Sequence, residues 1–158
     1  MNTIDFAINM ELEGQKYYLD QAELNRDNEL HAVFLMLADS EEGHANLLRR
    51  YKSKEALTLQ ADFVRPGLKS VFDGLGNFSK EDNTRQLDVY RIACQQEEKS
   101  IQLYREMEEQ AEESEKELFR YLVRQEEEHL LLFEELVKLL TRPEEWVESA
   151  EFGIREEY

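Results

Sequence analysis

The second half of this chain repeats the first half, with similar residues recurring at helical spacing. A shift of 86 positions aligns the segment predicted as a helix at 83–111 with the one at 3–25 over their common length, and a shift of 85 positions does the same for 114–141 and 28–52. The first alignment pairs Ala93 with Ala7, Glu97 with Glu11, Ser100 with Gly14 and Tyr104 with Tyr18. The second pairs Phe119 with Phe34, Leu122 with Leu37, Glu126 with Glu41, His129 with His44 and Leu132 with Leu47. Internal similarity of this kind indicates that one helical hairpin is used twice.

Helices are predicted for all four of these segments. Only six glycines and two prolines interrupt a chain rich in Glu, Leu, Gln, Lys, Arg and Ala, which are residue types that favour helix. The short link from Asn25 to Asn28 makes the first two helices antiparallel neighbours. The segment 53–82 contains proline and glycine and predicts a long crossover, with a short helix near 68–75. We therefore predict an all-α four-helix bundle in a single domain, residues 1–158.

The last residues of the chain are predicted to form a separate short helix. Proline disfavours helical geometry in the residue before it, so Thr141-Arg142-Pro143 is expected to end the fourth helix. The segment 143–158 then supplies apolar residues that dock this helix on the bundle: Trp146, Val147, Phe152 and Ile154.

A glutamate lies on the apolar stripe of each predicted helix, since residues three and four apart share a helix face. The first and third helices contribute Glu11 and Glu97, while the second and fourth contribute a Glu-x-x-His pair each: Glu41 with His44, and Glu126 with His129. Four buried carboxylates need a countercharge or protons. Two divalent cations neutralise them, and this ligand set is the one that di-iron helical bundles use.

Iron or manganese fits these oxygen and nitrogen ligands, so we predict a site for two iron ions, with manganese or zinc as other possible metals. Glu-x-x-His by itself is a weak signal in a chain so rich in glutamate. The signal becomes specific because both Glu-x-x-His motifs and both single glutamates lie on apolar stripes at matching positions of the repeat. The competing interpretation is that His44 and His129 are core histidines with satisfied hydrogen bonds.

Composition excludes several classes of function. Thirty-six acidic residues against nineteen basic ones give a formal charge of −17, which repels nucleic acids and anionic membranes. No apolar run is long enough to cross a membrane. The single cysteine, Cys94, permits neither an internal disulfide nor a thiolate metal site. We expect a cytoplasmic protein, and a homo-oligomer, with a dimer as the simplest form.

Three segments resemble the rubrerythrin branch of the ferritin-like superfamily: AINMELEGQKYY at 7–18, LADSEEGHA at 37–45 and EEKSIQLY at 97–104. The resemblance implies a ferritin-like fold and a di-iron centre that reduces hydrogen peroxide or reacts with oxygen. Carried over residue by residue, it implies that the iron ligands are Glu11, Glu41, His44, Glu97, Glu126 and His129. It thus agrees with the ligands that the stripes predict.

The chain departs from typical rubrerythrins in two ways. It cannot contain a rubredoxin domain with two Cys-x-x-Cys motifs, so electrons would come from a separate donor. Cys94 also occupies the position where the family has a further glutamate. We interpret Cys94 as a small core residue, with contact to iron or peroxide as the functional alternative. Tyr18 and Tyr104 are either core aromatics or hydrogen-bond partners beside the metals.

The leading functional hypothesis is therefore a di-iron oxidoreductase, most simply a peroxidase involved in oxidative stress, with a small-molecule oxidant as its substrate. One alternative is a ferritin-like protein that oxidises and handles iron without a reducing partner. Another is a non-catalytic metal-binding bundle whose site holds zinc or stays vacant.

Overall fold

The structure is a computed structural model that describes residues 2–59, 63 and 80–151, with Lys80 and residues 142–151 described by their backbone alone. Four long α-helices dominate the fold, and a short 3₁₀-helix, η1 (Glu113–Glu115), precedes the last of them. The helices are α1 (Thr3–Leu24), α2 (Leu30–Lys52), α4 (Lys80–Gln110) and α5 (Lys116–Glu151). The described residues contain no strand. The prediction of an all-α four-helix bundle is confirmed.

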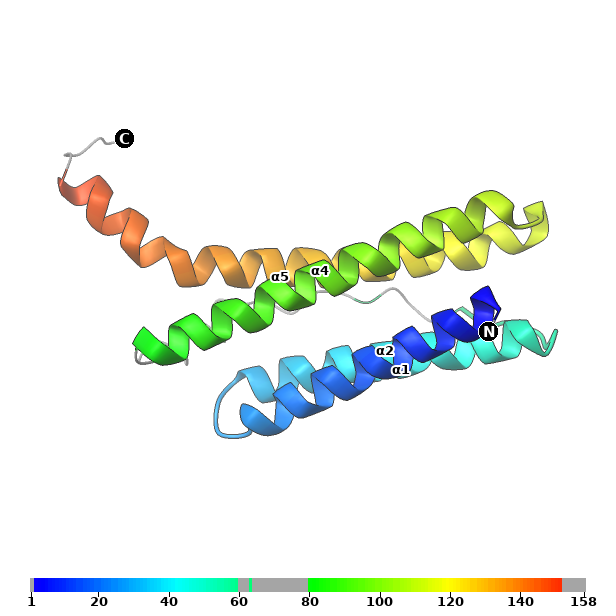
Figure 1. The fold of residues 1–158 in the computed structure, drawn as a ribbon, viewed down its shortest axis with the longest axis horizontal. Coiled ribbons are helices and arrows are strands. Elements are labelled where there is room, and N and C mark those ends of the chain that lie inside the picture. Colours follow the sequence, from blue (N-terminus) through cyan, green and yellow to red (C-terminus); the bar gives the residue numbers. More distant parts are fainter. Residues whose placement is uncertain (1, 60–62, 64–79, 152–158) are drawn as a thin grey trace.

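The helices pack as two hairpins, α1 with α2 and α4 with α5. Figure 1 shows these pairs lying side by side, with the blue and cyan hairpin next to the green and yellow-to-orange one. The first turn is short because Asn25 and Asn28 organise it. The side chain of Asn28 accepts a hydrogen bond from the backbone of Leu30 at 2.8 Å, while buried Asn25 donates to the carbonyl oxygen of Gln21 at 2.8 Å. These bonds satisfy backbone groups that a helix end leaves free.

The predicted end of the fourth helix at Thr141 is wrong, because α5 continues through Pro143 to Glu151. Proline removes one helical hydrogen bond and crowds the preceding turn, which bends a helix without always ending it. Figure 1 shows α5 bending where its colour changes from orange to red. The separate C-terminal helix is therefore an extension of α5. The side chains that were expected to dock it lie outside the described residues.

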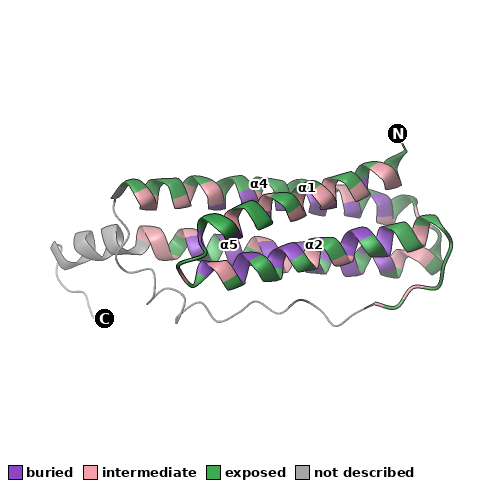
Figure 2. Ribbon diagram, turned by 90° about the horizontal axis from the view of Figure 1, so that it is seen from below, coloured by how far each residue is buried: buried purple, intermediate pink, exposed green. Residues whose placement is uncertain are grey.

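The apolar core consists of two clusters, one toward each end of the bundle. One cluster is rich in stacked aromatic rings, including Tyr18, Phe34 and Phe133. The other contains Leu48, Tyr104 and Phe119 among its buried members. Figure 2 shows the buried residues, in purple, following the inner faces of the helices. Apart from Asn25 in the first turn, the buried polar residues lie between the two apolar clusters along the helices.

The long connection between the hairpins is described only at residues 53–59 and at Phe63. The short helix predicted near 68–75 lies outside the described residues. In the part of the chain that the structure does describe, no helix is long and apolar enough to span a membrane.

Candidate metal centre

All six residues predicted as metal ligands meet in the middle of the bundle. Their side chains come from every long helix and are at most 3 % exposed: Glu11 of α1, Glu41 and His44 of α2, Glu97 of α4, and Glu126 and His129 of α5. Each sits on the inward stripe of its helix, where the 3.6-residue period places it with the apolar core residues. The structure thus brings together charged groups that are far apart in the sequence.

The six residues form two overlapping groups of four. One group contains Glu11, Glu41, His44 and Glu126, and within it one ligand atom from each residue lies within 4.8 Å of the others. The second contains Glu41, Glu97, Glu126 and His129 with the same limit. Glu41 and Glu126 belong to both groups. Two cations could therefore share these two carboxylates, while each would have one glutamate and one histidine of its own.

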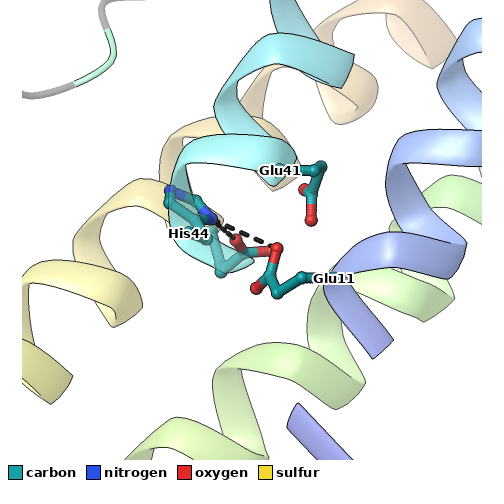
Figure 3. Close-up of side chains that lie close together, drawn as sticks. Glu11, Glu41 and His44 are labelled. Carbon is teal, nitrogen blue, oxygen red and sulfur yellow. Dashed lines mark ion pairs between the residues drawn. The ribbon is translucent and has the colours of Figure 1, made fainter. Parts of the chain in front are cut away.

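Each histidine turns its Nδ1 atom toward the carboxylates. His44 Nδ1 lies 2.8 Å from an oxygen of Glu126 and 3.3 Å from an oxygen of Glu11. His129 Nδ1 lies 3.1 Å from an oxygen of Glu41 and 3.4 Å from one of Glu97. Figure 3 shows Glu11, Glu41 and His44 pointing toward one another from their two helices. Nδ1 is therefore the nitrogen that faces a metal in both groups.

The outer nitrogen of each histidine faces a polar side chain from the opposite hairpin. His129 Nε2 lies 3.0 Å from the hydroxyl oxygen of Ser40, and His44 Nε2 lies 3.4 Å from the amide oxygen of Gln125. Ser40 also lies 3.4 Å from His44 Nε2. An acceptor at Nε2 holds the proton there and leaves Nδ1 free for a metal. Sequence reasoning missed both residues, although the 85-position shift aligns Ser40 with Gln125.

Two buried tyrosines also act across the hairpins. Tyr18 of α1 donates its hydroxyl to Glu97 of α4, and Tyr104 of α4 donates to Glu11 of α1, each at 2.5 Å. The sequence placed each tyrosine two turns from the glutamate of its own helix. The structure joins each one to the glutamate of the other helix instead. These bonds orient the carboxylates of Glu97 and Glu11, each of which belongs to only one of the two groups of four.

The electrostatics of the cluster divide the four glutamates into two classes. Burial, together with the charges of Glu11 and Glu97, raises the pKa of Glu41 well above its usual value. Burial and the charges of the other three glutamates likewise raise the pKa of Glu126 well above its usual value. Burial opposes ionisation of Glu97 too, but His129 and the hydrogen bond from Tyr18 lower its pKa to about 2.

The pKa of Glu11 is lowered because His44 and Tyr104 outweigh the effect of burial. Burial also disfavours a charge on His44, but Glu11 beside it gives a net rise in the pKa of this imidazole. Without metal, Glu41 and Glu126 therefore hold a proton more strongly than an ordinary carboxyl group, while Glu11 and Glu97 ionise more readily.

The cluster fits divalent cations because many of its polar atoms are unsatisfied. Among the described residues, four carboxylate oxygens of Glu11, Glu97 and Glu126 have no aligned hydrogen-bond partner, and neither has His44 Nδ1. Buried polar atoms normally have such partners. Cations bound by both groups of four would satisfy these atoms and replace the protons on the shared carboxylates. Oxygen and imidazole donors suit iron, manganese or zinc.

Cys94 is in neither group of four. It is partly buried and packs against the aromatic core cluster. Burial, with the nearby carboxylates of Glu134, Glu98 and Glu97, raises the pKa of its thiol to about 11. A reactive cysteine needs a stabilised thiolate, so these surroundings support the interpretation of Cys94 as a small core residue.

Four helices that each add a glutamate to one buried cluster, two of them adding a histidine, define a helical bundle protein whose carboxylate and histidine cluster could hold metal ions. The chain belongs to the rubrerythrin family, whose family model matches residues 2–137. Comparisons with curated proteins and with solved structures gave no match. Rubrerythrins typically bind iron, and the buried groups of this chain are able to hold metal ions.

Proposed function

We propose that the protein is a di-iron oxidoreductase that reduces hydrogen peroxide with electrons from a separate donor. The observation that carries this proposal is the pair of overlapping groups of four, which share Glu41 and Glu126. Two cations that share carboxylates would lie close to each other, and two ferrous ions at that separation could together supply the two electrons that peroxide reduction needs. The family membership supports iron as the metal.

The residues divide the work of such a site. Glu11 with His44, and Glu97 with His129, would each hold one iron, while Glu41 and Glu126 would bridge both. When bound, iron would supply the electrons for cleavage of the oxygen–oxygen bond. Tyr18 and Tyr104 keep Glu97 and Glu11 in place through their hydroxyl groups. Phe63 packs edge-on against His129 at 4.7 Å between ring centroids, which helps to exclude water from that side.

The test is the reaction of anaerobically loaded ferrous protein with hydrogen peroxide. Each peroxide that becomes two waters takes two electrons and two protons, so one peroxide should oxidise two ferrous ions. Glu41→Gln should abolish this stoichiometry, because Glu41 belongs to both groups. Glu42→Gln is the matched control, since the adjacent Glu42 is exposed and bonds to Gln15 on the surface. Retention of the wild-type stoichiometry in Glu41→Gln would contradict the proposal.

The same experiment discriminates the iron-handling alternative. A peroxidase should turn over repeatedly when a one-electron reductant is supplied, with both irons remaining bound. An iron-oxidising protein should instead consume one oxidant for each pair of ferrous ions added and release or store the ferric product. Repeated addition of ferrous iron without reductant, followed by metal analysis of the protein, separates these outcomes.

A further inference from the structure

A cavity of about 670 Å³ lies beside the cluster, between α1 and α4. Four residues of its lining belong to the centre or touch it directly: Gly14, Tyr18, Glu41 and Glu97. The cavity therefore connects Glu41, which belongs to both groups of four, and Glu97, which belongs to one, with the space between α1 and α4.

The wall of this cavity is largely apolar. It includes Phe6, Met10 and Leu103, and Phe6 is 54 % exposed although it is a large aromatic side chain. Ser100 adds a hydroxyl that already bonds to the carbonyl oxygen of Gln96 at 3.1 Å and faces the Met10 sulfur at 3.5 Å. Because the Ser100 hydroxyl is already paired, this part of the wall offers mainly apolar contact, and the unpartnered oxygen of Glu97 lies at the end near the cluster.

Small residues keep the cavity open at its inner end. A methyl group added at Gly14 would lie 3.1 Å from a carboxylate oxygen of Glu41, which is closer than ordinary contact. The equivalent position on α4 is Ser100, which is also small. A larger side chain at Gly14 would therefore separate the cavity from Glu41 or displace that carboxylate.

The size and charge of the cavity indicate its ligand. Hydrogen peroxide is only slightly larger than water, whereas about 670 Å³ falls in the range of cavities that bind organic molecules. Glu13 and Glu106 at the rim outnumber Lys99, which disfavours anions. We propose that the cavity binds a neutral organic hydroperoxide, with its apolar group against Phe6, Met10 and Leu103 and its peroxide directed toward Glu41 and Glu97. This inference rests on the proposed function.

The reaction is the organic counterpart of peroxide reduction. Two electrons, drawn from two ferrous ions, and two protons cleave the oxygen–oxygen bond. The organic oxygen leaves as an alcohol and the other oxygen as water, while two ferric ions remain. The alcohol product has the same shape as the substrate without its reactive bond, so it is a suitable probe of binding alone.

The first experiment measures binding of 2-phenyl-2-propanol, the alcohol formed from cumene hydroperoxide. In the full chain with ¹³C-labelled methionine methyl groups, the Met10 signal should shift saturably with the alcohol, with and without added zinc. Met36 is the internal control, because it is 43 % exposed and does not line the cavity. Leu103→Trp, which fills the cavity, should weaken this binding at least about tenfold. Leu35→Trp, on an exposed part of α2 outside the cavity, should not change it.

The second experiment compares oxidation rates of the ferrous protein by cumene hydroperoxide and by hydrogen peroxide. Leu103→Trp should lower the rate constant for the organic peroxide at least about tenfold more than that for hydrogen peroxide. Absence of a saturable Met10 shift, or equal shifts of Met10 and Met36, would overturn the inference. Reaction with hydrogen peroxide but not with cumene hydroperoxide would overturn it while the proposed function stands. Alcohol binding without reaction of either peroxide would overturn both.

Discussion

The two hairpins contribute the same ligands to the centre but surround them differently. Glu11, Glu41 and His44 of the first hairpin have counterparts at the same repeat positions in the second. Their neighbours do not match. The side chain facing the outer nitrogen of a histidine is a hydroxyl in one case, from Ser40, and an amide in the other, from Gln125. The repeat therefore places the groups that could hold metal ions, whereas the unmatched neighbours make the two groups of four chemically unequal.

The largest effect on metal binding is expected from substituting glutamates that occupy equivalent positions in the two hairpins. Glu11→Ala combined with Glu97→Ala should eliminate binding of two metals per chain, because α1 and α4 contribute no other group to the cluster. Metal analysis after equilibrium loading measures the stoichiometry. Glu13→Ala combined with Glu98→Ala is the matched control, since both of these side chains are exposed. An unchanged stoichiometry in the first double variant would show that the ligands are assigned incorrectly.

Removal of metal should loosen the contact between the hairpins, since the cluster joins all four helices. A ligand present at about one hundred times its dissociation constant adds about 2.7 kcal/mol to the free energy of unfolding. We expect the metal-free protein to be less stable than the loaded protein by at least this amount near neutral pH. Thermal unfolding followed by circular dichroism checks this. A metal-free melting temperature equal to that of the loaded protein would contradict a site shared between hairpins.

The stability of the metal-free protein should fall as the pH rises from 5 to 8. Glu41 and Glu126 have raised pKa values, as does His44, so the folded state holds protons that the unfolded state has released. Stability decreases with pH wherever the folded state binds more protons. The slope should be about 1 kcal/mol per pH unit. Urea unfolding across this range measures it, and Glu41→Gln should reduce the slope. A rise in stability over the same range would contradict protonated shared carboxylates.

The different partners of the two histidines should make the two metal-binding steps distinguishable. Ser40→Ala removes the partner of His129 Nε2, and Gln125→Ala removes the partner of His44 Nε2. Loss of such a partner typically weakens metal binding about tenfold or more. Gln125→Ala should therefore weaken one of the two steps in a calorimetric titration, whereas Ser40→Ala, whose hydroxyl also lies 3.4 Å from His44 Nε2, should weaken mainly the step that uses His129. Ser40→Ala should have the larger effect, because its contact is shorter, at 3.0 Å against 3.4 Å. Equal weakening of both steps by either variant would remove the distinction.

The smallest effect concerns Gly14 and its counterpart Ser100. Gly14→Ala should weaken metal binding a few-fold, because the new methyl group displaces a Glu41 oxygen that would lie 3.1 Å away. The metal-free protein should keep its stability, since alanine in a helix gains about 0.5–1 kcal/mol over glycine. Ser100→Ala is the control and should leave metal affinity unchanged. Unchanged affinity in Gly14→Ala would show that Glu41 accommodates the methyl group freely.

The sequence predicted the helices and the meeting of the six buried groups because both depend on local periodicity. Apolar stripes and the Glu-x-x-His spacing are visible within single helices, and the repeat aligns them. Contacts between the two hairpins were harder to predict from the sequence. Ser40 and Gln125 are ordinary polar residues in the sequence, and only the packing of α2 on α5 brings them to the histidines. Pro143 misled the prediction of α5, since one lost hydrogen bond does not end a helix whose next residues also favour it.

The crosswise contacts have a consequence for how such a chain is built. Each histidine contacts one glutamate of its own hairpin and one of the other hairpin. Each tyrosine donates a hydrogen bond to a glutamate of the other hairpin. Exchanging each residue with its repeat counterpart in the other hairpin gives the same set of contacts again. Residues 3–52 paired with their own copy in this geometry would present the same six groups. In a pair of identical chains every substitution occurs twice; joining the copies into one polypeptide is what allows Gly14 and Ser100, or Ser40 and Gln125, to differ.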